Sequence, residues 1–85
     1  MEDDLFDLKV NNRKDFIKFI NALHTEFLKN GSEWENNTLE RFLEAMTAYS
    51  EDIQGYYNNC EDSKDANMPT WQTFADIITG AIIYE

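Results

Sequence analysis

The sequence predicts an all-α protein, a compact three-helix bundle with a short N-terminal extended arm. Three stretches of the 85-residue chain repeat apolar residues every three or four positions, which is the spacing of one helix face. Polar segments that contain Gly or Pro separate them. The hydrophobic fraction of 42%, with two Trp, four Tyr and six Phe, exceeds that of a disordered acidic chain and supports one small domain over residues 1–85.

The arm is expected over residues 1–11. Its apolar residues Phe6, Leu8 and Val10 alternate with charged residues, a pattern typical of an extended segment that lays one side on a core. A lone strand would have no partner, so we expect an arm and not a sheet.

The first helix is expected over residues 13–29. Asn12 can cap it, and Asp15 then stands near the positive end of the helix dipole. The main apolar face consists of Phe16, Phe19, Ile20, Leu23 and Phe27. Gly31 is a stop signal, and Trp34 in the connection after it is expected to fold back over the core.

The second helix is expected over residues 38–58. Asn37, with Glu40 three residues later, resembles a capping box. Its apolar positions are Leu39, Phe42, Leu43, Met46, Tyr49, Ile53, Tyr56, Tyr57 and Cys60. Gly55 costs about 1 kcal/mol relative to Ala, so the last turn is expected to fray or bend.

The third helix is expected over residues 70–84, after an acidic loop. Thr70 follows Pro69 and is a plausible cap. The apolar face consists of Trp71, Phe74, Ala75, Ile78, Ala81 and Ile82. A terminal strand over residues 82–84 is the alternative. We expect the first two helices to be antiparallel, and a four-helix arrangement through dimerisation stays open.

Negative charge dominates the chain and is unevenly distributed. Seventeen Asp and Glu against seven Lys and Arg give a net charge of −10. Six acids and five bases leave residues 1–30 at −1, whereas eleven acids and two bases give residues 31–85 a charge of −9. This balance argues against nucleic acid and anionic membranes as partners, because both repel an acidic surface.

Few residues suggest catalysis or metal binding. Glu40 and Glu44 lie one helical turn apart and could act as an acid and base or bind a cation, but we interpret them as a solvated acidic face. The only His, His24, and the only Cys, Cys60, are too few for a zinc site. The loop over residues 61–67 lacks the Gly of a calcium-binding loop. We therefore predict no enzyme activity, cofactor or metal.

The sequence also predicts a compartment. The first residues are acidic where a signal peptide would be basic and then apolar, and no apolar run approaches the length of a membrane span. Together with the single Cys60, which cannot form an intrachain disulfide, this favours the cytoplasm.

The chain resembles a known family in three places. These are the stretch from Trp34 to Ala45 (WENNTLERFLEA), the Tyr56-Tyr57 pair, and the segment from Trp71 to Glu85 that contains W-x-x-F-A-D-I-I and ends in I-Y-E. The pattern resembles a family of small, uncharacterised bacterial proteins, classed as a domain of unknown function, over about residues 12–85. The resemblance implies a bacterial cytosolic origin and one helical domain, and supplies no activity or site residues.

The leading interpretation is a non-enzymatic module that binds a basic protein partner through acidic groups. A specific version is an immunity or antitoxin-like protein that blocks a basic toxin such as a nuclease. The expected contact residues are Glu40, Glu44, Glu51, Asp52, Tyr56, Glu61 and Asp62. The first alternative is a helical domain whose charge serves only solubility, and the second is a carboxylate-based enzyme or metal binder. The sequence does not determine the oligomeric state, and both a monomer and a dimer stay open.

Overall fold

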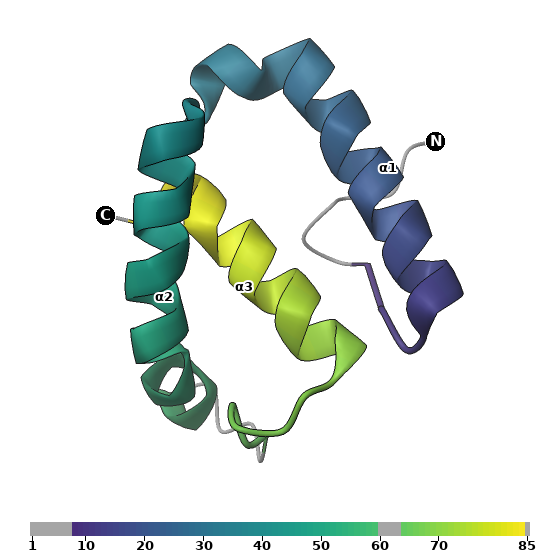
Figure 1. The fold of residues 1–85 in the computed structure, drawn as a ribbon, viewed down its shortest axis with the longest axis vertical. Coiled ribbons are helices and arrows are strands. Elements are labelled where there is room, and N and C mark those ends of the chain that lie inside the picture. Colours follow the sequence, from purple (N-terminus) through teal and green to yellow (C-terminus); the bar gives the residue numbers. More distant parts are fainter. Residues whose placement is uncertain (1–7, 60–63, 85) are drawn as a thin grey trace.

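Helices provide all the regular secondary structure of the residues that the computed structural model describes, which are 8–59 and 64–84 (Figure 1). They are α1 (Arg13–Asn30), the 3₁₀ helix η2 (Gly31–Glu33), α2 (Leu39–Asn59) and α3 (Trp71–Ile83). The sequence-based ranges differ from the bounds of the three α-helices by at most one residue. The predicted all-α class is confirmed.

Side-chain caps explain where the helices begin. Asn12 Oδ1 accepts the amide hydrogen of Asp15 at 2.8 Å at the start of α1, and Thr70 Oγ1 accepts that of Thr73 at 3.0 Å at the start of α3. The predicted Asn37 cap of α2 is wrong. Thr38 takes that place, because its hydroxyl accepts the amide hydrogen of the third helical residue at 3.2 Å.

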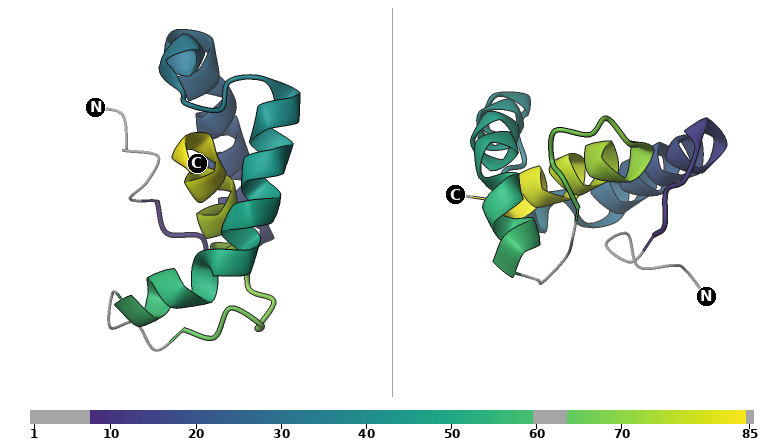
Figure 2. Two further views of the ribbon diagram at one scale, coloured as in Figure 1. Left: turned by 90° about the vertical axis from the view of Figure 1, so that its left-hand side faces the viewer. Right: turned by 90° about the horizontal axis from the view of Figure 1, so that it is seen from below.

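The third helix is the centre of the molecule. It lies between α1 and α2, which run in opposite directions, and it packs more extensively against α2 than against α1 (Figure 1). The described part of the arm, residues 8–11, lies on the side of α3 that faces away from the viewer in Figure 1, as the turned views of Figure 2 show. The arm therefore covers one side of α3, and α1 and α2 flank this helix.

The core joins the arm to α1 and α3. Its buried cluster consists of Val10, Phe19, Ala75 and Ile82. Trp34 packs against this cluster, with its ring centroid 5.1 Å from that of Phe27 and 6.5 Å from that of Phe42. The expectation that this loop tryptophan folds back over the core is confirmed.

The connection between α1 and α2 also holds the end of α3. The Asn36 backbone amide donates to the Ile82 carbonyl at 3.0 Å. The Asn36 side-chain amide donates to the carbonyls of Ala81 at 2.9 Å and Tyr84 at 2.7 Å. These bonds satisfy carbonyl groups that a helix end otherwise leaves unpaired, so Asn36 fixes the C-terminal end of α3.

Two helical glycines have different surroundings. The last turns of α2, which contain Gly55, run at an angle to the rest of that helix, in line with the expected bend (Figure 2). A Cβ at Gly55 would meet no atom within 4 Å, whereas a Cβ at Gly80 would overlap the ring of Tyr49. Gly80 therefore allows α2 and α3 to approach closely.

We expect Gly80→Ala and Gly55→Ala to change stability in opposite directions. Gly80→Ala should lower the free energy of unfolding by about 1–2 kcal/mol, because overpacking outweighs the gain in helix propensity. The Tyr49 ring has little room to move, since it packs edge-on against Tyr84 at 5.1 Å. Gly55→Ala should raise the free energy by about 0.5–1 kcal/mol. Urea denaturation measures both, and a stabilised Gly80→Ala variant would contradict the close approach.

Candidate functional site

Three glutamates form an exposed line along α2. Glu40, Glu44 and Glu51 are separated by four and seven residues, a spacing that places them on one side of a helix. All three side chains are exposed. Within the described part of the chain, none of them makes a hydrogen bond or an ion pair. We call these residues the glutamate stripe.

The other predicted contact residues do not join this stripe. Asp52 accepts a hydrogen bond from the Tyr84 hydroxyl, which holds it toward the end of α3. Tyr56 is 52% exposed, and its ring centroid lies 6.3 Å from that of Tyr49 on the Asp52 side of the helix. Glu61 and Asp62 lie outside the described residues. The site predicted from sequence is thus divided, and the glutamate stripe is the part that stays together in the open.

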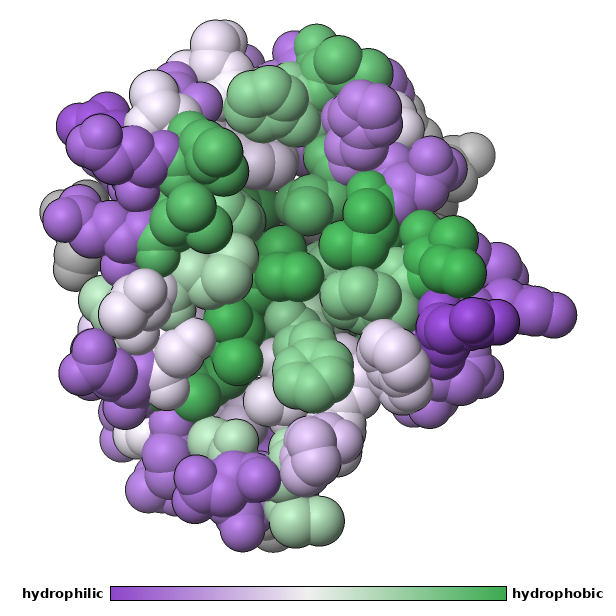
Figure 3. All heavy atoms as spheres, in the orientation of Figure 1, coloured by the Kyte–Doolittle hydropathy of each residue, from purple (hydrophilic) through white to green (hydrophobic). Residues whose placement is uncertain are grey.

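An apolar groove lies between the second half of α1 and the first turn of α2, close to the Glu40 end of the stripe. It encloses about 350 Å³. We call it the α1–α2 groove, and its lining consists of Ile20, Leu23, His24, Phe27, Trp34, Asn36, Asn37, Thr38, Leu39 and Phe42. On the face of the molecule that Figure 3 shows, hydrophobic residues gather in the middle and hydrophilic residues form the margins.

Sequence reasoning assigned the apolar residues of this groove to the core. In the structure, Leu39 is 74% exposed, Leu43 one turn later is 50% exposed, and Phe27 is 43% exposed. The width of the apolar stripe on the second helix was the available signal, because Leu39 and Leu43 extend it on one side. When the apolar stripe of a helix is wider than one neighbouring helix can cover, some of its apolar residues stay exposed to solvent.

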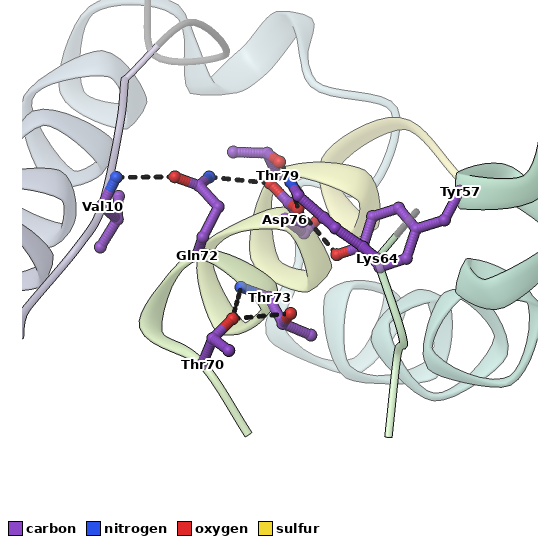
Figure 4. Close-up of polar contacts among 8 residues, drawn as sticks. All are labelled: Val10, Tyr57, Lys64, Thr70, Gln72, Thr73, Asp76 and Thr79. Carbon is purple, nitrogen blue, oxygen red and sulfur yellow. Dashed lines mark hydrogen bonds and ion pairs between the residues drawn. The ribbon is translucent and has the colours of Figure 1, made fainter. Parts of the chain in front are cut away.

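A polar cluster, separate from the groove, links four segments of the chain (Figure 4). The Tyr57 hydroxyl donates to Asp76 Oδ2 at 2.8 Å, and Gln72 Nε2 donates to Asp76 Oδ1 at 3.0 Å. Lys64 Nζ lies 3.5 Å from Asp76 Oδ2. Gln72 Oε1 accepts the Val10 amide hydrogen at 2.7 Å. The cluster ties the arm and the loop before α3 to α2 and α3, which is a structural role.

The environment of Tyr57 changes its acidity. Burial, with the hydrogen bond to the Asp76 carboxylate and its charge, raises the pKa of the Tyr57 phenol well above its ordinary value of 10.0. The Thr73 hydroxyl partly opposes this shift. The hydrogen bond to Asp52 likewise raises the pKa of the exposed Tyr84 phenol.

Alkaline pH is expected to destabilise the fold through Tyr57. Above about pH 10 the phenol ionises in the unfolded chain but keeps its proton in the folded one. The stability that Tyr57 contributes is therefore complete below pH 10 and is lost as the pH rises beyond it, by up to about 1.4 kcal/mol per pH unit. Urea denaturation between pH 9 and 11.5 should show a shallower decline for Tyr57→Phe, and identical slopes would contradict this assignment.

The remaining candidates for chemistry are dispersed. Glu40 and Glu44 are both exposed, and neither lines the α1–α2 groove. His24 lines the groove, and Cys60 lies outside the described residues. Among residues 8–59 and 64–84, no three His, Cys, Asp or Glu side chains gather as a metal site requires. None of the helices in these two ranges is both long enough and apolar enough to cross a bilayer.

Comparison with known proteins places the chain in a family. A family model described as "Family of unknown function (DUF7660)" matches residues 12–85, the same part of the chain that carries the sequence resemblance. No curated protein and no solved structure matches the chain. On the extent of the family match, the chain belongs to the family of unknown function DUF7660.

Proposed function

We propose that this chain is a non-enzymatic interaction module that binds a basic protein through the glutamate stripe. The observation that supports this most is the exposure of Glu40, Glu44 and Glu51 in a stripe that begins beside the apolar α1–α2 groove. An apolar centre with charged groups at its edge is the usual composition of a protein-binding surface. The net charge of −10 favours a partner of opposite sign.

The electrostatics suit rapid and selective association. Exposed carboxylates attract a basic protein over about 10 Å at 0.1 M salt, and they repel acidic competitors. Rim charges of this kind act mainly on the association rate and on partner choice. The apolar groove would then slow dissociation, because burying it removes apolar area from water.

A specific form of the proposal is an immunity or antitoxin-like protein that blocks a basic toxin in the bacterial cytoplasm. A toxin gene next to the gene for this chain would favour that form. The first alternative, a domain whose charge serves only solubility, requires no partner. The second, a carboxylate-based enzyme or metal binder, would need Glu40 and Glu44 to be enclosed, and both are exposed.

Affinity isolation at two salt concentrations tests the proposal. The tagged chain is incubated with an extract of the cells that express it, at about 50 mM and about 500 mM salt, and the retained proteins are identified and quantified. We expect a basic protein at one-to-one stoichiometry that is retained at low salt and reduced at high salt, because salt screens exposed charges. The absence of any stoichiometric partner at both salt concentrations would leave the solubility alternative.

A further inference from the structure

The α1–α2 groove is an apolar surface that residues 8–59 and 64–84 leave open. The described part of the arm lies on the other side of α3 and does not reach it (Figures 1 and 2). Leu39, Leu43 and Phe27 are each more than two-fifths exposed on its walls or beside them. Clustered apolar side chains of this size on a small domain mark a surface that another molecule covers.

The shape of the groove limits what can occupy it. Its two walls are antiparallel helices, with Ile20 and Phe27 on α1 and Leu39 on α2. Its floor contains the ring of Trp34, which is held in place between Phe27 and Phe42. An apolar groove between two helices is the type of surface into which an amphipathic helix lays its apolar face.

The charges on the two walls differ, and this difference orients the occupant. The glutamate stripe borders the Leu39 and Leu43 row along the outer side of α2. On α1, the residues that line the groove are apolar except for His24. The binding of an occupant helix is therefore most favourable if its Lys and Arg residues project over α2 and its other flank carries no excess of positive charge.

We propose that the α1–α2 groove binds an amphipathic helix of the basic partner, with that helix's basic flank over the glutamate stripe. This inference rests on the proposed function, and it specifies which structural element of the partner is recognised, namely a helix. The helix should present apolar residues at positions i, i+3, i+4 and i+7 to the groove. The arrangement combines apolar burial with charge pairing along one edge.

A synthetic peptide probe tests the groove directly. The probe is an 18-residue helix-forming peptide with leucines on one face and lysines along one flank of that face. Its controls are a peptide of the same composition with the order scrambled, and a peptide with glutamate in place of each lysine. In the Trp71→Phe background, Trp34 is the only tryptophan, so its fluorescence reports on the floor of the groove. We expect the first peptide to bind and change this signal, and both controls to bind at least about tenfold more weakly.

Matched variants locate the binding site. Leu39→Ser with Leu43→Ser should weaken binding of the probe by about tenfold or more, because Leu39 lines the groove and Leu43 is exposed beside it, one turn further along α2. Ile83→Ser is the control, since Ile83 is 61% exposed on α3 and does not line the groove. Circular dichroism verifies that all variants fold. Equal weakening by the control would overturn the assignment.

Other outcomes overturn this inference and leave the proposed function standing. Equal binding of the scrambled peptide would mean that charge alone attracts basic chains to the surface. Sedimentation that shows self-association of the wild type, abolished by the Leu39 and Leu43 substitutions, would mean that a second copy occupies the groove. Conversely, a probe that binds as expected, with no basic protein recovered from cells at either salt concentration, would contradict the proposed function alone.

Discussion

Phe19→Ala is expected to lower the free energy of unfolding by about 3–5 kcal/mol, which approaches the whole stability of a domain of this size. The Phe19 side chain is 1% exposed and contacts the buried cluster that joins the arm, α1 and α3. Its ring also stacks on that of Phe16, with centroids 5.8 Å apart. A chain this short buries only a modest core, so the cavity would affect every element that meets there.

The matched control for this prediction is Phe74→Ala. Phe74 is 41% exposed, so the same substitution removes less buried area and should cost about 1 kcal/mol or less. Urea denaturation followed by circular dichroism gives both values. A loss for Phe19→Ala no larger than that for Phe74→Ala would contradict the placement of the core.

Reversal of the glutamate stripe is expected to produce the largest loss of binding. The variant with Glu40→Lys, Glu44→Lys and Glu51→Lys replaces three attractions by repulsions, each worth about 1 kcal/mol at an exposed site. The affinity for the basic partner should fall by about 100-fold, mainly through a slower association rate. Calorimetry and stopped-flow kinetics with the isolated partner measure the two quantities.

A comparison at equal net charge separates the stripe from the overall charge. Glu44→Lys with Glu51→Lys is compared with Glu33→Lys and Glu35→Lys, two exposed glutamates before α2. Both pairs change the net charge by the same amount, but only the first pair changes the stripe. Equal losses of affinity would mean that the partner responds to total charge and that the stripe is not its site.

The helices could be predicted from sequence because their signals are local. Asn12 and Thr70 lie next to the apolar repeats that they begin, and the spacing of those repeats identifies each helix. Asn37 and Thr38 are adjacent and both can cap a helix. The spacing of the apolar residues does not define the first residue of α2 closely enough to choose between them.

The wide apolar stripe of α2 indicated that some apolar residues stay exposed, but the place of the open groove could not be predicted, because it depends on how helices distant in sequence are placed. Leu39 and Leu43 have the same spacing as buried residues of their helix, and only the position of α3 shows which side of that stripe is covered. The bonds from Asn36 to the end of α3 span more than forty residues and leave no local trace in the sequence. Long-range pairings of this kind determined where the candidate surface lies.

The central position of α3 has a consequence for biosynthesis. The ribosome makes α1 and α2 first, yet the helix that both pack against is translated after them. Until Trp71–Ile83 has emerged, the nascent chain holds two amphipathic helices whose apolar faces lack their common support. The three helices can therefore pack together only after α3 has been translated, and until then the apolar faces are available to chaperones that recognise exposed apolar segments.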